Sequence, residues 1–252
     1  MPAVGQARMT HSKIICIIQA RMGSSRLPGK VLAELAGRTL LDQVIGRLRG
    51  AKTLSQIVVA TSDLPQDRAI VDHCEANGYA YFAGSHDDVL NRFARAAEKF
   101  AADIVVRVTA DCPLIDPAIV DKVVASLLAD PKLDCACNVF PRRTFPRGLD
   151  VEAMTRTTLR KLDVSCRESR HREHVSLAIY ENLNEFRIGS LISDQDRSDL
   201  RWTVDEQSDL LLIREMYNAF TGRNFSWVDC LRAYRQHPQW RTINAHVEQK
   251  AA

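Results

Sequence analysis

The residues best suited to chemistry lie in one short loop near the start of the chain. Residues 19–30 contain three cations, Arg21, Arg26 and Lys30, and no acid. Guanidinium and ammonium groups bind phosphate oxygens through charge-assisted hydrogen bonds. Small residues stand between the cations, let the backbone approach a ligand and offer N–H groups to anionic oxygens: Gly23, Ser24, Ser25 and Gly29. The loop therefore predicts a phosphate-binding site.

The order of residues in this loop differs from two common phosphate-binding motifs. A Walker A loop has Ser or Thr after its lysine, whereas Val31 follows Lys30 here, and the loop has no G-x-G-x-x-G pattern. A solvated basic loop without a ligand is the alternative interpretation. It is disfavoured because the loop follows an apolar strand, and ligands of parallel sheets bind at the carboxyl ends of strands.

Two aspartates follow other short apolar runs and have the chemistry of metal ligands. Asp111 comes after residues 104–108, and Asp205 comes after residues 200–204. Mg²⁺ commonly takes one or two protein carboxylates and completes its shell with water and phosphate oxygens. Either aspartate alone would fit a helix cap equally well. Together with a phosphate-binding loop, the pair favours an Mg²⁺ site.

Alternating strands and helices are expected to position these groups. Apolar, β-branched runs predict strands at 13–19, 57–61, 79–82 and 104–108. Helical spacing and capping residues, among them Thr39 and either Asp87 or Asp88, predict helices at about 40–48, 66–77 and 89–100 and a helix opened by Pro117. This alternation predicts an α/β fold with a Rossmann-like, mostly parallel sheet and helices on both faces.

The regular alternation of predicted strands and helices changes after residue 130. Strands are predicted at 135–139, 149–154 and 186–192, separated by a basic, proline-broken loop and two helices. We interpret 135–200 as a lobe inserted on the same sheet. A strand at 200–204 and helices at about 206–220 and 226–236 complete the pattern. The expected organisation is one domain over 13–240, a flexible tail at 1–12 and a C-terminal tail at 241–252.

Composition excludes several other classes of protein. The chain has 252 residues, 46% of them hydrophobic, and a formal net charge of +3. This apolar content opposes disorder, and the near balance of charge opposes a nucleic-acid binder. No apolar run reaches the roughly 18–20 residues of a membrane span. Seven cysteines without a C-x-x-C pair predict reduced, structural thiols and a cytoplasmic location.

Several blocks of the sequence resemble cytidylyltransferases that activate acidic sugars. Residues 18–30 resemble the opening signature of these enzymes. Further matching blocks follow in the same order at 87–93, 107–115, 146–152, 172–175 and 201–205. The chain most resembles the spore coat polysaccharide biosynthesis protein F family, which is related to CMP-Kdo and acylneuraminate cytidylyltransferases. The resemblance extends over about residues 13–235.

This resemblance implies a glycosyltransferase-A-like nucleotidyltransferase fold and a homodimer. The implied reaction transfers CMP from CTP to an acidic sugar, releases pyrophosphate and serves a surface polysaccharide or glycoconjugate. By the same resemblance, Arg21, Arg26 and Lys30 hold the triphosphate, and Asp111 and Asp205 bind the Mg²⁺ cofactor. The implied nucleotide-binding residues are Ala20, Gly23, Ser24, Ser25, Asp88, Asn91, Arg92 and Thr109. Thr109 stands where the Kdo enzymes have a glutamine, which leaves the base preference open.

The sugar site is expected in the 135–200 lobe, because arginines bind carboxylates bidentately and acids on one face of a strand accept sugar hydroxyls. The candidate substrate-binding residues are Arg147, Asp150, Glu152, Arg172 and His174. A dimer surface is the alternative role for the lobe. A metal shared by His171 and His174 is disfavoured, because no third ligand with zinc-site spacing follows. Cys112 is interpreted as a packing residue rather than a nucleophile.

Two other functions remain open for the chain. A nucleotidyltransferase of this type could use another nucleotide, or a sugar phosphate as acceptor. A catalytically silent nucleotide-binding module would share the fold. The presence of the loop cations together with both aspartates opposes that last interpretation, because a silent module has no need of metal ligands.

Overall fold

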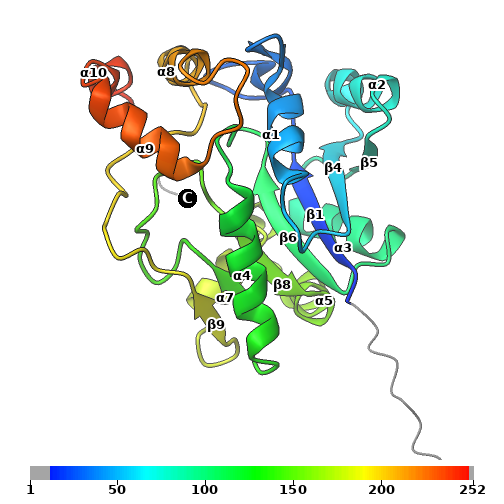
Figure 1. Cartoon of the computed structure of the whole chain (residues 1–252). Helices are drawn as coiled ribbons and strands as arrows, with labels where there is room; N and C mark the ends of the chain where they lie inside the picture. Colours follow the sequence, from blue (N-terminus) through cyan, green and yellow to red (C-terminus); the bar gives the residue numbers. More distant parts are fainter. Residues whose placement is uncertain (1–11, 250–252) are drawn as a thin grey trace, which may run out of the picture.

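One seven-stranded sheet runs through residues 12–249, the part of the chain described by the computed structural model (Figure 1). The strand order is β5-β4-β1-β6-β8-β7-β9. Four strands are parallel: β1 (Ile14–Gln19), β4 (Gln56–Ser62), β5 (Ala80–Gly84) and β6 (Ile104–Thr109). The other three are β7 (Cys135–Cys137), β8 (Glu152–Thr155) and β9 (Ile188–Ser190); β8 is antiparallel to both β6 and β7, and β9 is parallel to β7. The predicted α/β fold with a mostly parallel sheet is confirmed.

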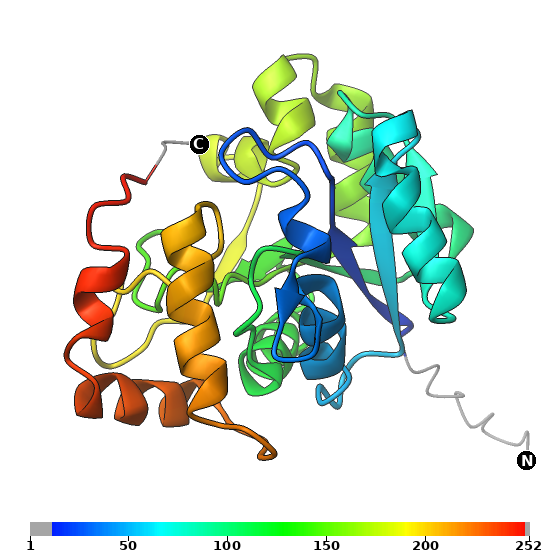
Figure 2. The ribbon, with the colours of Figure 1, turned by 90° about the horizontal axis from the view of Figure 1, so that it is seen from above.

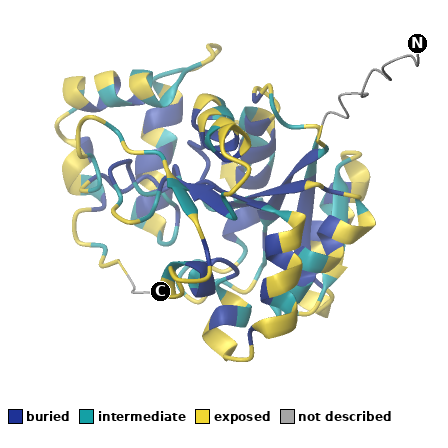
Figure 3. Ribbon diagram, turned by 90° about the horizontal axis from the view of Figure 1, so that it is seen from below, coloured by how far each residue is buried: buried dark blue, intermediate teal, exposed yellow. Residues whose placement is uncertain are grey.

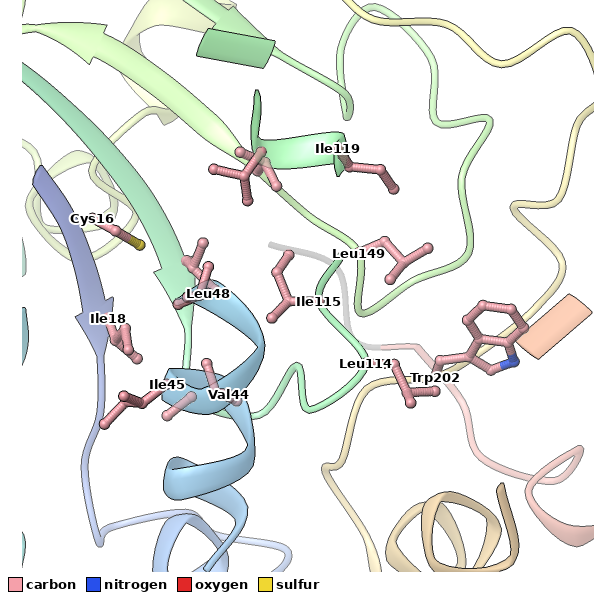
Figure 4. Close-up of a cluster of buried hydrophobic side chains, with 14 of the residues drawn as sticks. Cys16, Ile18, Val44, Ile45, Leu48, Leu114, Ile115, Ile119, Leu149 and Trp202 are labelled. Atoms are coloured by element: carbon pink, nitrogen blue, oxygen red, sulfur yellow. The ribbon is translucent and has the colours of Figure 1, made fainter. Parts of the chain in front are cut away.

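Two hydrophobic cores lie on opposite faces of the sheet because side chains of a strand alternate between its faces. On β1, Cys16 and Ile18 belong to the core formed with α1 (Leu40–Leu48) and α4 (Pro117–Ala129). Figure 4 shows part of this cluster. Residues 15 and 17 pack into the other core, with α3 (Val89–Lys99) and α5 (Arg156–Ser165). In Figure 3 the strands are buried between helices whose outer faces are exposed.

Side-chain caps begin several helices where the sequence predicts them. Thr39 accepts a hydrogen bond from the backbone of Asp42 in a capping box at the start of α1, and Asp88 caps α3 through the backbone N–H of Asn91. The helix predicted from about 66 begins with a 3-10 turn, η2 (Pro65–Asp67), and continues as α2 (Arg68–Ala76). Before α1 lie a second 3-10 turn and a small hairpin: η1 (Lys30–Leu32), β2 (Glu34–Leu35) and β3 (Arg38–Thr39).

The inserted lobe extends the same sheet, but the strand predicted at 200–204 is wrong. Between β8 and β9 there are three helices instead of two: α5, α6 (Ser169–Glu173) and α7 (Leu177–Glu181). The 200–204 segment forms one isolated bridge, between Arg147 and Arg201. The backbone N–H of Trp202 donates to the carbonyl of Arg147, but that of Val204 donates to the carbonyl of Asp111. Hydrogen bonds to two different segments prevent a regular ladder.

Three helices close the chain: α8 (Gln207–Asn218), α9 (Trp227–Gln236) and α10 (Trp240–Ile243). The prediction of a tail from residue 241 is wrong for its first part, because α10 continues to Ile243 and Asn244 is buried. The tail predicted at 1–12 lies almost wholly outside the described residues. Within residues 12–249, no helix has the length and apolar character to cross a membrane.

Candidate active site

Three segments from different parts of the chain meet at one cavity of about 280 Å³. The loop after β1, seen in blue in Figure 2, contributes Arg21, Ser24, Ser25, Arg26 and Lys30. The end of β6 and the loop that follows it contribute Thr109 and Asp111, and the segment before α8 contributes Asp205. The structure therefore brings the three predicted cations and both predicted acids to one place.

Lys30 links the two aspartates. Its Nζ donates to Asp111 Oδ2 at 2.9 Å, to Asp205 Oδ1 at 2.8 Å and to the backbone carbonyl of Val204 at 2.7 Å. Burial alone would lower the pKa of Lys30, but the two carboxylates raise it above its ordinary value. The ammonium is therefore charged at neutral pH.

Asp205 faces three cations. Its Oδ2 lies 2.8 Å from Arg201 and 3.1 Å from Arg26, in addition to the Lys30 contact of Oδ1. Burial tends to raise the pKa of Asp205, but the cations, led by Lys30, lower it. The alternative role of Asp205 as a helix cap is wrong: Glu206 is the N-cap of α8.

Backbone contacts bring Asp111 and Asp205 together from distant parts of the sequence. The N–H of Val204 donates to the carbonyl of Asp111 at 2.9 Å, and Thr109 Oγ1 donates to Asp111 Oδ1 at 2.6 Å. Gly148 makes room for this approach. Its φ is +100°, and a Cβ there would lie 2.6 Å from the carbonyl carbon of Trp202.

Asp67, a residue that was not predicted from the sequence, anchors the backbone of the cationic loop. The backbone N–H of Met22 donates to Asp67 Oδ1 at 2.6 Å, and Ser62 donates to the other oxygen of the same buried carboxylate. Gly29 turns the chain back into η1 with a φ of +72°. The loop is thus anchored by its backbone, while its cations point to the cavity.

A buried network behind Asp205 also escaped the sequence analysis. The Asp209 carboxylate is fully buried and accepts from both Nε and a terminal nitrogen of Arg201, each at 3.0 Å. It also accepts from the backbone of Asp205 at 2.9 Å and from the Asn244 side chain at 2.9 Å. Asn244 donates to the carbonyl of Arg201 as well, at 3.0 Å. The C-terminal segment therefore supports the position of Asp205.

Replacing Asn244 by alanine should lower the free energy of unfolding by about 1–3 kcal/mol, because it leaves buried acceptors unsatisfied. Urea denaturation followed by circular dichroism measures the change. The matched control is Asn218→Ala, at an exposed position at the end of α8. Equal stability of the two variants would show that the Asn244 contacts contribute nothing.

A second cavity of about 270 Å³ shares Thr109 with the first, and its wall includes three predicted substrate residues: Asp150, Glu152 and His174. Arg143 binds Asp150 through both of its terminal nitrogens, one of them at 2.7 Å. Glu152 accepts from Arg107, Ser176 and Tyr180. Burial would raise the pKa of Glu152, but Arg107 and the hydroxyl donors lower it. The carboxylate is therefore ionised in a buried position.

The remaining predicted residues line neither cavity. Arg172 binds Asp88 at 2.8 Å and Asp163 at 2.6 Å, and Asn91 contacts Asp163 as well, so this group joins α6 to α3 and α5. Seven predicted residues line neither of these two cavities: Ala20, Gly23, Asp88, Asn91, Arg92, Arg147 and Arg172. Arg92 is almost fully buried, donates to the carbonyl of Ser85, and burial lowers its pKa to about 10.

The cysteines and His171 have packing or pairing roles in the structure. All seven cysteines are buried and free, and burial raises the pKa of the Cys112 thiol well above its ordinary value. His171 contacts Glu181 at 2.7 Å. The interpretation of Cys112 as a packing residue agrees with a thiol that stays protonated.

Two of the missed residues carry a signal in the sequence. Arg107 is a charged residue inside an apolar strand, and such a residue requires a buried partner. Asp209 stands three residues after Glu206, at the spacing of a capping box. Asp67 has no such signal, because its partner Met22 is 45 positions away in the sequence.

The donor set of Asp111 and Asp205 fits a divalent cation. Both carboxylates line the cavity and already share one cation, the Lys30 ammonium. Two carboxylates with access to substrate oxygens are typical of Mg²⁺, which keeps several ligands from water or phosphate. The chemistry of these residues therefore supports Mg²⁺ as a candidate cofactor.

A mostly parallel α/β sheet with cations and acids near its strand ends is typical of nucleotide-binding enzymes, and comparison with known proteins specifies the fold and the family. The chain belongs to the cytidylyltransferase family, whose model matches residues 15–223. A cytidylyltransferase structure from Leptospira borgpetersenii superposes with a TM-score of 0.88 at 34% sequence identity, over 96% of this chain and all of that chain. The family resemblance found in the sequence is confirmed.

Two relatives and one further solved structure are similar to this chain. An uncharacterized protein of Methanocaldococcus jannaschii is 36% identical over 197 residues, 77% of this chain and 79% of the relative. The spore coat polysaccharide biosynthesis protein SpsF of Bacillus subtilis is 31% identical over 166 residues, 64% of this chain and 66% of the relative. A CMP-Kdo synthetase solved with CTP shares the fold, with a TM-score of 0.63 at 20% identity, over 82% of this chain and 99% of that chain.

Proposed function

We propose that this chain transfers CMP from CTP to an acidic sugar of the Kdo or nonulosonate type and releases pyrophosphate. The observation that carries the proposal is the meeting of Arg26, Lys30, Asp111 and Asp205 at one cavity. The names of the relatives add support, because SpsF is a polysaccharide biosynthesis protein and two more distant relatives are 3-deoxy-manno-octulosonate cytidylyltransferases.

In the proposed reaction, a sugar hydroxyl oxygen attacks the α-phosphorus of CTP, and the bond to the β-phosphate breaks. Negative charge builds up on the phosphate oxygens and on the leaving pyrophosphate, so fixed cations lower the barrier. Arg21, Arg26 and Lys30 supply those cations from a loop that Asp67 anchors. The backbone of this loop is fixed before the nucleotide binds, so only the side chains have to reorganise.

Mg²⁺ is the cofactor in this proposal, with Asp111 and Asp205 as its protein ligands. When bound, the ion neutralises charge on the phosphate oxygens. Arg201 helps to keep the Asp205 carboxylate ionised, Asp209 holds the backbone N–H of Asp205, and Thr109 orients Asp111. Lys30 moves its bonds from the aspartates toward the triphosphate when substrate arrives.

The second cavity is the proposed sugar site, because it adjoins the first through Thr109. His174 and Arg143 are the groups in its wall suited to a sugar carboxylate, and Asp150 is suited to sugar hydroxyls. Glu152 and Arg107 hold each other within the wall. In this proposal they shape the cavity instead of binding the substrate.

A pyrophosphate-release screen tests the proposal. CTP, GTP, ATP and UTP are each supplied with Mg²⁺ and with acidic sugars, neutral sugars or sugar phosphates. We expect release only with CTP and an acidic sugar. Equal rates with all four nucleotides would contradict the CTP preference, and turnover confined to sugar phosphates would contradict the acceptor.

The Arg26→Ala variant should bind CTP more weakly by about 1.5–3 kcal/mol, the range for one hydrogen bond to a charged group. Isothermal titration calorimetry measures the Kd. Arg68→Ala, which removes an exposed arginine of α2, is the matched control. An unchanged Kd in the Arg26 variant would remove this side chain from the nucleotide site.

A further inference from the structure

A larger cavity, of about 720 Å³, lies away from both cavities described above. It is bounded by α1, the start of α4 and the turn that joins α8 to α9; Figure 1 shows α1, α4, α8 and α9. Three arginines line it, Arg38, Arg47 and Arg223, each from a different element or turn. Among residues 12–249, no aspartate or glutamate belongs to this lining.

Arg47 is the most deeply placed of the three. Its Nε donates to the carbonyl of Ile115 at 2.6 Å, and its guanidinium carbon lies 4.3 Å from the centre of the Phe225 ring. The carboxylate paired with it is Asp116, at 3.9 Å, a separation beyond hydrogen-bond distance. The terminal nitrogen facing Asp116 has no hydrogen-bond partner among the described residues.

Asp116 makes no hydrogen bond to Arg47 because other donors use both of its oxygens. One of its oxygens caps α4 through the N–H of Ala118 at 2.9 Å, and the other accepts from the backbone of Trp227 at 2.8 Å. These contacts hold the carboxylate at the joint between α4 and α9. Asp116 therefore pairs with Arg47 at 3.9 Å without a hydrogen bond.

The other two arginines are exposed and available to a ligand. Arg38 forms no ion pair or side-chain hydrogen bond with any residue in the described range 12–249. Arg223 donates to the carbonyl of Ala219 at 3.0 Å and has no carboxylate partner within the same range. Three arginines thus line a cavity to whose wall no acid of the described residues contributes, since Asp116 lies outside that lining.

We propose that this cavity binds a small phosphorylated metabolite at a site separate from the active site. Guanidinium groups match phosphate oxygens bidentately, and several of them around one concave space favour a multiply charged anion. The volume exceeds the 280 Å³ of the active-site cavity, so an organic phosphate fits as well as a bare ion. The proposal is independent of the identity of the sugar substrate.

Calorimetric titration with tripolyphosphate, without Mg²⁺, tests the site. The unmodified protein should bind at two places, the active-site loop and the arginine cavity. A double variant with Arg38→Gln and Arg223→Gln should bind tripolyphosphate more weakly at the arginine cavity. We expect the affinity there to fall by about tenfold or more, the equivalent of about 1.4 kcal/mol. Arg26→Ala should weaken only the other one, which separates this proposal from the proposed function.

The matched control replaces two exposed arginines elsewhere, Arg160→Gln and Arg235→Gln, and changes the net charge equally. The proposal is overturned if the cavity variant and this control bind tripolyphosphate with the same affinity. Arg47→Lys is a second variant, which keeps the positive charge but lacks the planar guanidinium group. It should weaken tripolyphosphate binding without unfolding the protein. Glucose 6-phosphate and CMP then distinguish a sugar phosphate from a nucleotide.

Hydrogen exchange supplies an independent reading. Tripolyphosphate should slow exchange of backbone amides in residues 219–225, which form the turn beside the arginines, in both the unmodified protein and the Arg26→Ala variant. Unchanged exchange in this turn overturns the proposal even if calorimetry detects two sites.

Discussion

Replacing Asp111 by alanine should lower pyrophosphate release from CTP by about 10²–10³-fold or more, the loss typical when one group that stabilises transition-state charge is removed. Asp111 shares the Lys30 ammonium with Asp205 and is oriented by Thr109, so its carboxylate has one defined position at the cavity. A coupled assay over a range of Mg²⁺ concentrations measures the effect. The loss should persist at high Mg²⁺.

The matched control is Asp72→Ala, at an exposed aspartate of α2 that forms a surface ion pair with Arg68. Asp111 is the cleaner test of the two acids, because removal of Asp205 leaves Arg26 and Arg201 without this partner and lowers stability as well. Near-normal release by a folded Asp111→Ala protein would show that the proposed metal site is wrong.

The Glu152→Gln variant should lose about 3–5 kcal/mol of folding free energy, the usual result of removing one partner from a buried ion pair. Arg107 of β6 would then be left without its counter-charge. Ser176 and Tyr180 would lose a charged hydrogen-bond acceptor. Urea denaturation at pH 7 measures the change. Glu98→Gln, at an exposed position on α3, is the control.

The effect of Glu152 should depend on pH in one direction. Its pKa in the folded protein lies below its ordinary value of 4.5, so its contribution is present above about pH 4.5 and disappears as the pH falls through the lower, folded value. The stability difference between the unmodified protein and Glu152→Gln should therefore shrink in acid. A difference that grows in acid would contradict the ionised state assigned to this carboxylate.

The sequence alone determined the parts of the molecule that depend on local order. Strand-helix alternation predicted the parallel sheet, and capping residues such as Thr39 and Asp88 predicted where helices begin. The three cations of one loop lie within ten residues of each other and follow a strand, so their common site was visible as a local pattern. Local propensities and strand-end geometry act over short distances, and these features therefore needed no tertiary information.

The tertiary structure decided which distant groups meet and which role each of them has. The antiparallel direction of β8 places Glu152 opposite Arg107, and this register turns a predicted sugar ligand into half of a buried ion pair. Asp205 is held by Asp209, which Asn244 in turn contacts, although residues 241–252 looked like a tail. A buried charge takes its role from its partners, because the cost of leaving it unpaired exceeds any local preference. Those partners lie far away in the sequence, so packing alone specifies them.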